Sequence, residues 1–268
     1  MKFFAALAAL LFAGLAFAAE KAPSSSPVAL SDGEMLRYRV RWGLFANAGE
    51  ITVSARAEEQ FGLPEIRITT HTNTRGFVRG FYLFDGDGES VFDARDGRLL
   101  AISTWSTSSK KNTKTMAVFD YQKNVVRYVD YVRTERSEDL ELPEGNPMDL
   151  ITCLIETRRW DLKPGERSQA TVIFDKDFYD ITIVAEGTER IRTPMGEFDT
   201  LVLRPVMEKN PRGLFKRGGR VRVWISQDEK RLPVQFEVGM KFGTGTALLT
   251  EYRPPGSAGV ANDANPHP

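Results

Sequence analysis

A strict alternation of apolar and polar residues between positions 220 and 242 constrains the fold of this chain more than any other feature. Val221, Val223 and Ile225 occupy every second position, and after a polar stretch at 227–231 the alternation resumes. The later apolar positions are Leu232, Val234, Phe236, Val238, Met240 and Phe242. A period of two is typical of strands with one buried face, so we predict two antiparallel strands joined by a polar turn. That face must be covered, because burying each such side chain contributes about 1.5–3 kcal/mol.

Shorter segments with the same period occur along most of the chain. The clearest is at 36–42, where apolar residues alternate with Arg37, Arg39 and Arg41. Further strands are expected at 51–57, 66–72, 89–93, 99–105, 115–121, 125–132, 170–174, 179–186, 189–193, 198–206 and 247–252. Regular turn signals between short strands favour a mainly β fold, here a large curved antiparallel sheet or an open barrel.

One helix is expected to cover this sheet, over residues 146–160. Asn146 is a suitable N-cap and Pro147 suits the first helical position. The apolar stripe consists of Met148, Ile151, Leu154 and Ile155. A helix with such a stripe is expected to pack on one face of the sheet as its principal cover.

The segment at 75–84 breaks the strand pattern. Gly76 and Gly80 space an aromatic group there, formed by Phe77, Phe81, Tyr82 and Phe84. We interpret the segment as a loop or a single helical turn. Its rings are expected to fill the core or, alternatively, to line or rim an apolar ligand site.

The first residues have the pattern of a cleaved secretory signal. Lys2 precedes an apolar run at 3–17, and Ala16-Phe17-Ala18 is a small-x-small cleavage pattern. The run is shorter than the roughly 20 apolar residues that span a bilayer. We therefore predict a signal peptide at 1–18, a flexible leader at 19–30, one β-rich domain at 31–253 and a disordered tail at 254–268. The expected location is the periplasm, without a transmembrane anchor after cleavage.

Charge and cysteine content exclude some classes of protein. The 36 basic and 36 acidic residues balance, so no general attraction to nucleic acid is expected. The single cysteine, Cys153, cannot form a disulfide within the chain.

No motif predicts catalysis or metal binding. His267 lies in the tail, and His71 shares the polar face of a strand with Arg67 and Asn73. The acidic stretch at 85–96 has Ser90 where a calcium loop requires glycine, so a polar turn is the better interpretation. Neither HExxH nor CxxC is present. We expect no catalytic residues, no metal and no cofactor, and an enzyme is only the third hypothesis.

Four segments, taken in order, carry a resemblance to a known family. They are Gly33-Glu34 leading into the strand at 36–42, Pro-Met-Asp-Leu-Ile at 147–151, Thr-Pro-Met-Gly-Glu-Phe at 193–198, and Val-Trp-Ile-Ser-Gln-Asp at 223–228 followed by Arg-Leu-Pro-Val at 231–234. From about residue 31 to 252 the chain resembles the DUF3108 family of exported bacterial proteins. That family has no established activity, so the resemblance implies location and architecture but no catalytic residues.

The closing hairpin also resembles the end of periplasmic lipoprotein carriers of the LolA and LolB type. This resemblance implies a LolA- or lipocalin-like sheet that is capped by helices and holds acyl chains. Our leading hypothesis is a non-catalytic periplasmic protein that binds a lipid, an amphiphile or another envelope component. The expected contacts are Phe77, Phe81, Phe84, Val223, Phe236, Val238 and Met240 for apolar chains, with Arg217 or Arg220 near a headgroup.

The alternative hypothesis is a structural or assembly module of the cell envelope. Its core would be filled by its own side chains. A basic loop at 209–220, with Arg212, Lys216 and Arg217 around Leu214 and Phe215, would contact a protein or glycan partner. The same loop could instead be merely solvated.

Overall fold

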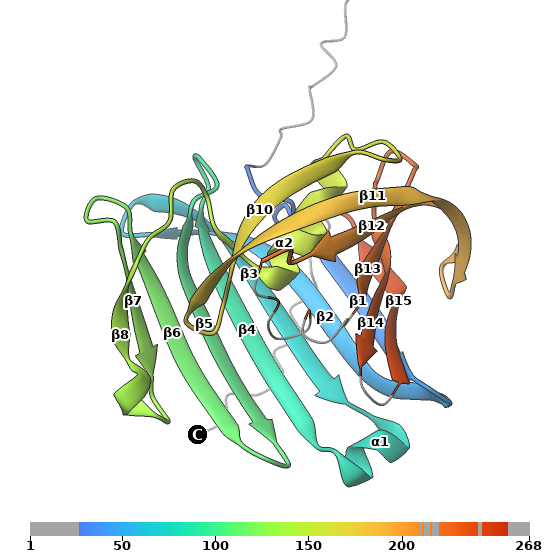
Figure 1. Ribbon diagram of the computed structural model, residues 1–268, viewed down its shortest axis with the longest axis horizontal. Coiled ribbons are helices and arrows are strands. Elements are labelled where there is room, and N and C mark those ends of the chain that lie inside the picture. Colours follow the sequence, from blue (N-terminus) through green and yellow to red (C-terminus); the bar gives the residue numbers. More distant parts are fainter. Residues whose placement is uncertain (1–26, 210, 212–214, 216–219, 241–242, 257–268) are drawn as a thin grey trace, which may run out of the picture.

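A single sheet of 15 strands winds around a shared interior (Figure 1). The structure is a computed structural model, and it describes residues 27–209, 211, 215, 220–240 and 243–256. The sheet order runs from β8 at one edge through β1 and β15 in the middle to β9 at the other edge. No backbone pairing joins β8 to β9. The prediction of a large curved sheet or open barrel with one principal covering helix is confirmed.

Two antiparallel meanders make up this sheet. The first comprises β1 (Met35–Trp42), β2 (Phe45–Gln60), β3 (Leu63–Thr74), β4 (Phe84–Asp93), β5 (Leu99–Ser108), β6 (Asn112–Asp120), β7 (Val125–Asp130) and β8 (Glu138–Glu141). The second comprises β9 (Met148–Asp149), β10 (Arg167–Phe174), β11 (Asp177–Thr193), β12 (Gly196–Val206), β13 (Val221–Ser226), β14 (Pro233–Met240) and β15 (Gly243–Arg253). Pairing of β1 with β15 joins the meanders, and the only parallel pair among the described strands is β9 with β10.

Four short helical segments with fully described bounds interrupt the strands. They are α1 (Gly76–Phe81), η1 (Thr134–Arg136), α2 (Leu150–Glu156) and η2 (Thr157–Arg159), the last continuing directly from α2. The interpretation of residues 75–84 as containing a helical turn is confirmed by α1.

The predicted start of the covering helix is wrong. Met148 and Asp149 pair with β10, so the backbone stays extended until Asp149, whose carboxylate accepts the Thr152 N–H at 2.9 Å. Asn146 instead donates its side-chain N–H to the Gly97 carbonyl at 3.2 Å. A short edge strand therefore occupies the residues in which the sequence pattern predicted the first helical turn.

The helix α2 lies between two groups of buried apolar side chains. Ile155 packs into the first group, with Tyr38 and Phe92. Cys153 and Leu154 pack into the second, against the inner faces of β10 to β13. Val223 belongs to this second group and has no exposed surface. The apolar face of β13 is thus covered by the protein's own side chains.

The folded region begins earlier than the predicted boundary at residue 31. Val28, Ala29 and Leu30 are buried in the first apolar group, so these leader residues contribute to the core. Their path passes close to Gly97, where an added Cβ would lie 2.7 Å from the Pro27 carbonyl oxygen. Gly97 also has a φ of +74°, which glycine adopts without steric cost.

Arginine side chains fix the end of the covering helix. Arg158 forms an ion pair with Glu34 at 2.6 Å and donates to the Lys230 carbonyl at 3.0 Å. Arg231 donates to the carbonyls of Arg158 and Trp160 at 2.7 and 3.0 Å. These contacts connect the N-terminal residues, η2 and the turn between β13 and β14.

Candidate functional site: a cationic cavity beside β12 and β13

A cavity of about 580 Å³ opens beside the ends of β12 and β13. It is lined by Glu186, Arg204, Pro205, Val206, Met207, Pro211, Phe215, Arg220 and Arg222. Pairing of β11, β12 and β13 brings these residues together from three separate parts of the sequence.

The side chains that line this cavity carry more positive than negative charge. Two of its arginines share the Glu186 carboxylate, with Nε of Arg204 at 2.6 Å from Oε1 and Nε of Arg222 at 3.0 Å from Oε2. Arg220 is exposed and has no carboxylate at ion-pair distance among the described residues. Three guanidinium groups therefore face one carboxylate, which leaves the cavity cationic.

Apolar side chains border the arginines. Met207 is only 7% exposed, and Phe215 packs against the second apolar group. Val206 completes this border. The cavity thus presents guanidinium groups next to an apolar surface, an arrangement that suits a molecule with an anionic group and an apolar part.

Of the predicted ligand residues on the C-terminal hairpin and the basic loop, Arg220 lines the cavity. Val223 does not, because alternation turns it to the opposite side of β13 from Arg222, where it is buried. Phe236 and Val238 are half-buried and pack against the second apolar group. Arg217, with Arg212, Leu214 and Lys216 of the predicted basic loop, and the side chain of Met240 lie outside the described residues.

The predicted aromatic contacts lie elsewhere. Phe77 and Phe81 on α1 are 74% and 51% exposed and do not line the cavity. Phe84 is half-buried on β4, with its ring over Gly86, where an added Cβ would lie 2.8 Å from the ring. The predicted ligand residues are therefore not gathered in one site.

Part of the inner wall is polar rather than apolar. Ile68 is buried, and Thr70 and Thr72 lie on the same face of β3. Their cross-strand partners on β4, β5 and β6 extend this face as two rows of residues across the sheet. The rows are Thr70, Gly88, Thr104 and Thr115, and Thr72, Gly86, Ser106 and Thr113. Hydroxyl groups and glycines thus take the place of apolar side chains on this part of the inner wall.

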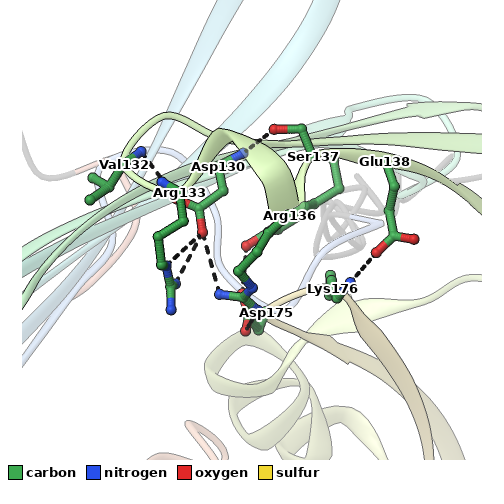
Figure 2. A network of polar contacts seen from close by, with 9 residues as sticks. Asp130, Val132, Arg133, Arg136, Ser137, Glu138, Asp175 and Lys176 are labelled. Atoms are coloured by element: carbon green, nitrogen blue, oxygen red, sulfur yellow. Dashed lines mark hydrogen bonds and ion pairs between the residues drawn. The ribbon is translucent and has the colours of Figure 1, made fainter.

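Side-chain contacts join regions at the two ends of the sheet order (Figure 2). Asp175, in the turn between β10 and β11, accepts hydrogen bonds from Tyr128 of β7 and Arg136 of η1. Next to it, Lys176 forms an ion pair with Glu138 of β8. We call these five residues the seam. It connects segments that backbone pairing leaves apart.

A second cavity, of about 250 Å³, lies beside β9 and β10. Its lining includes Glu144, Asn146, Gln169 and Asp180. No guanidinium or ammonium group lines it, so it lacks the cationic character of the larger cavity.

The side chains considered for catalysis and metal binding have surroundings typical of structural residues. His71 is exposed on β3 with its Nδ1 beside the Asp87 carboxylate. Burial raises the pKa of the Cys153 thiol to about 12. In the described part of the chain, no three His, Cys, Asp or Glu side chains are grouped as a metal site would require. None of the described helices combines the length and apolar character needed to cross a bilayer.

Sequence reasoning found Arg220 but missed Glu186, Arg204 and Arg222. Arg220 and Arg222 alternate with Val221 and Val223, which does indicate a cationic face on β13. The other two residues join that face through the pairing of β12 with β11 and β13. No local pattern specifies that pairing.

The first of three similar solved structures supports the fold. A β-barrel-like protein of the domain of unknown function DUF1849 from Brucella abortus is similar with a TM-score of 0.53 at 10% identity, covering 84% of this chain and 98% of that one. A DUF1089 family protein from Pseudomonas aeruginosa has a TM-score of 0.40 at 12% identity, covering 72% and 91%. A candidate exported protein with a YmcC-like fold from Bacteroides fragilis has a TM-score of 0.32 at 10% identity, covering 84% and 97%.

Sequence comparison identifies the family. No curated protein matches the chain. The family described as "Protein of unknown function (DUF3108)" matches residues 37–250, which include nearly all of the sheet. This chain therefore belongs to the DUF3108 family.

Proposed function

We propose that this protein is a non-catalytic, exported periplasmic protein that binds an anionic amphiphile of the cell envelope in the cationic cavity. The observation that carries the proposal is the 580 Å³ cavity in which Arg204, Arg220 and Arg222 adjoin Met207 and Phe215. Its volume falls within the range of about 300–1,000 Å³ typical of small-molecule sites.

The arginines supply the recognition of the anionic group. A guanidinium group is planar and donates paired hydrogen bonds to a phosphate or carboxylate. Glu186 holds Arg204 and Arg222 in place, whereas Arg220 retains its full donor capacity among the described residues. We therefore assign Arg220 the principal contact with the anionic group and the other two arginines a supporting one.

The apolar part of the ligand would lie against Val206, Met207 and Phe215. This differs from the arrangement expected from sequence, in which an acyl chain lay along Val223. Val223 is fully buried in the second apolar group, so a chain there would have to displace part of the core. The apolar side chains that border the arginines favour an amphiphile over a small inorganic anion.

A structural or assembly module is the second candidate. The observation that favours it is the filled interior, where Tyr38, Phe92 and Tyr128 are at most 2% exposed. Such a module needs no small ligand, and the cavity would then be a shallow, solvated feature of the surface.

Titration with a fluorescent anionic amphiphile tests the proposal. We would use 11-(dansylamino)undecanoic acid and, as the matched uncharged probe, its primary amide. The acid should bind saturably and more tightly than the amide, and Arg220→Gln should weaken acid binding about tenfold or more. Arg56→Gln, at a remote arginine that is 79% exposed, is the control and should leave binding unchanged.

Absence of saturable binding by the acid, together with no amphiphile in an organic extract of the purified protein, would leave the assembly module as the better description. Equal binding of the acid and the amide would also overturn the role assigned to the arginines.

A further inference from the structure

Four aromatic rings form a preformed cluster where β1, β2 and α1 meet. Phe77 stacks on Phe45 with ring centroids 5.5 Å apart and meets Phe81 edge-on at 5.6 Å. Trp42 lies 6.4 Å from Phe45 and 6.2 Å from Phe81. With Leu44, in the turn between β1 and β2, these residues form a surface that we call the aromatic rim.

The rim is exposed rather than part of the core. Leu44 is 100% exposed and Phe77 74%, while Phe81 and Phe45 are 51% and 37% exposed. The rings mainly cover one another, and neither buried apolar group contains them. Large apolar side chains gathered on a surface indicate an interaction site.

Ion pairs hold the rim in this exposed position. Val78 anchors α1 in the interior at 4% exposure. Arg79 binds Asp85 through both guanidinium NH groups at 2.8 and 2.7 Å, and Arg75 binds Glu50 at 2.8 Å. The two carboxylates beside the rim are therefore already neutralised.

Exposed cations lie near the rim. Arg41 precedes Trp42 on β1 and is exposed. Lys110 and Lys111 lie in the turn between β5 and β6. The Ser109 N–H in this turn donates to the carbonyl of Leu83, which lies between α1 and β4, at 2.9 Å, and the Leu83 N–H donates to the Ser109 hydroxyl at 2.8 Å. Within the described residues, none of these three cations has a carboxylate at ion-pair distance. Figure 1 shows α1, the turn between β1 and β2 and the turn between β5 and β6 at the same end of the sheet.

Exposed rings with exposed cations nearby match the chemistry of a lipid surface. Aromatic side chains favour the boundary between headgroups and acyl chains, and each lysine or arginine near an anionic membrane adds attraction. A protein partner would have to cover the same rings and also supply carboxylates for the cations, whereas an anionic bilayer provides both environments together.

We propose that the aromatic rim docks this protein on the surface of a bilayer that contains anionic lipid. The rings of Phe45, Phe77 and Phe81 enter the interface, while Arg41, Lys110 and Lys111 contact the headgroups. The strand register places Arg220 of the cavity three strands from Trp42 at this end of the sheet, roughly 15 Å away at normal strand spacing. Docking does not depend on the cavity holding a ligand.

Vesicle co-sedimentation tests this proposal on the full mature chain. Vesicles of phosphatidylcholine alone would be compared with vesicles in which three parts in ten are phosphatidylglycerol. The protein should sediment with the anionic vesicles, and Phe77→Ser with Phe81→Ser should lower the bound fraction about tenfold. The control, Phe61→Ser with Phe174→Ser, removes rings that are 95% and 55% exposed but lie outside the rim, and it should bind normally.

The contribution of the lysine charges to vesicle binding is measured separately. Lys110→Gln with Lys111→Gln should reduce binding to anionic vesicles about fivefold for each charge removed, with little effect on the residual binding to phosphatidylcholine. Circular dichroism and thermal melting of each variant would show that these exposed substitutions leave the fold intact.

Several results would overturn the proposal. One is an absence of sedimentation with either vesicle; another is equal loss of binding in the rim variant and its control. A concentration-dependent dimer that Phe77→Ser abolishes, without vesicle binding by the wild type, would reassign the rim to self-association. Because the Arg220-dependent part of the dansyl signal reports on the cavity, failure of docking and failure of amphiphile binding remain distinguishable.

Discussion

The hydroxyl of Tyr128 donates a hydrogen bond to the carboxylate of Asp175 across 47 residues of sequence. Tyr128 lies on β7, next to one edge strand, and Asp175 lies in the turn that follows β10, next to the other. Burial and this hydrogen bond raise the pKa of Tyr128 well above its usual value, so the hydroxyl keeps its proton at neutral pH. The contact therefore joins the two meanders where backbone pairing does not.

Removing the Asp175 charge should loosen the seam. Asp175→Ala leaves the Tyr128 hydroxyl and the Arg136 guanidinium without this acceptor, so we expect the free energy of unfolding to fall by about 1–3 kcal/mol. Urea denaturation measures this change. Asp161→Asn, at an exposed carboxylate before β10, is the control and should stay within about 0.5 kcal/mol of wild type. Equal effects of the two changes would show that the seam contributes no stability.

The neighbouring Asp130 should make the fold sensitive to acid. Burial opposes its ionisation, but the N–H groups of Arg133 and Val132 and the Arg133 guanidinium outweigh burial and lower its pKa from 3.8. Below that value the unfolded chain takes up the proton first, so the stabilisation present at neutral pH is lost as pH falls through the native pKa. Asp130→Asn should be less stable than wild type at pH 7, with the difference shrinking below about pH 4. A difference that stayed constant from pH 7 to pH 3 would contradict this assignment.

The alternation of apolar and polar residues predicted most strands of the sheet, but not the contacts between its two edges. Residues 36–42 and 221–225 have patterns that locate β1 and β13, because one face of each strand is buried. The seam depends on contacts such as that between Tyr128 and Asp175, whose partners are distant in sequence. The helix N-cap was misplaced because the pairing of Asp149 with β10 overrides the local preference of Asn146.

A double-mutant cycle should reveal strong coupling between Glu34 and Arg158. Their side chains are 2% and 12% exposed, and the ion pair joins the N-terminal residues to η2. Glu34→Gln should cost about 3–5 kcal/mol because it leaves a buried guanidinium without its carboxylate. Glu34→Gln with Arg158→Met removes both charges and should cost less than the sum of the single changes. Additive costs in urea denaturation would refute the coupling.

The Cys153 thiol should report whether α2 is docked. It has no exposed surface, and burial raises its pKa to about 12, so little thiolate forms at pH 8. We expect no reaction with Ellman's reagent in the native protein and one equivalent of thiol after unfolding in urea. Rapid labelling of the native protein would mean that α2 opens from the second apolar group under native conditions.

The candidate site was less predictable than the fold for a physical reason. Arg220 stands out locally as part of a basic stretch, but its surroundings come from β11 and β12, which are distant in sequence. Phe77 and Phe81 illustrate the opposite case, since their aromatic character is obvious in the sequence and only the structure shows that they are exposed. Composition identifies such groups, whereas tertiary packing decides whether they face the core or the solvent.

Glu186 provides the sharpest test of the cavity, because its removal should act in the opposite direction to removal of Arg220. The carboxylate forms ion pairs with both Arg204 and Arg222, and its negative charge repels an anionic ligand. Glu186→Gln should therefore tighten binding of 11-(dansylamino)undecanoic acid severalfold, whereas Arg220→Gln weakens it. The uncharged amide probe should bind both variants equally, which separates an electrostatic effect from a change in cavity shape. If Glu186→Gln weakened binding of the acid, the carboxylate would be needed to position the two guanidinium groups, and its repulsion of the ligand would be the smaller effect.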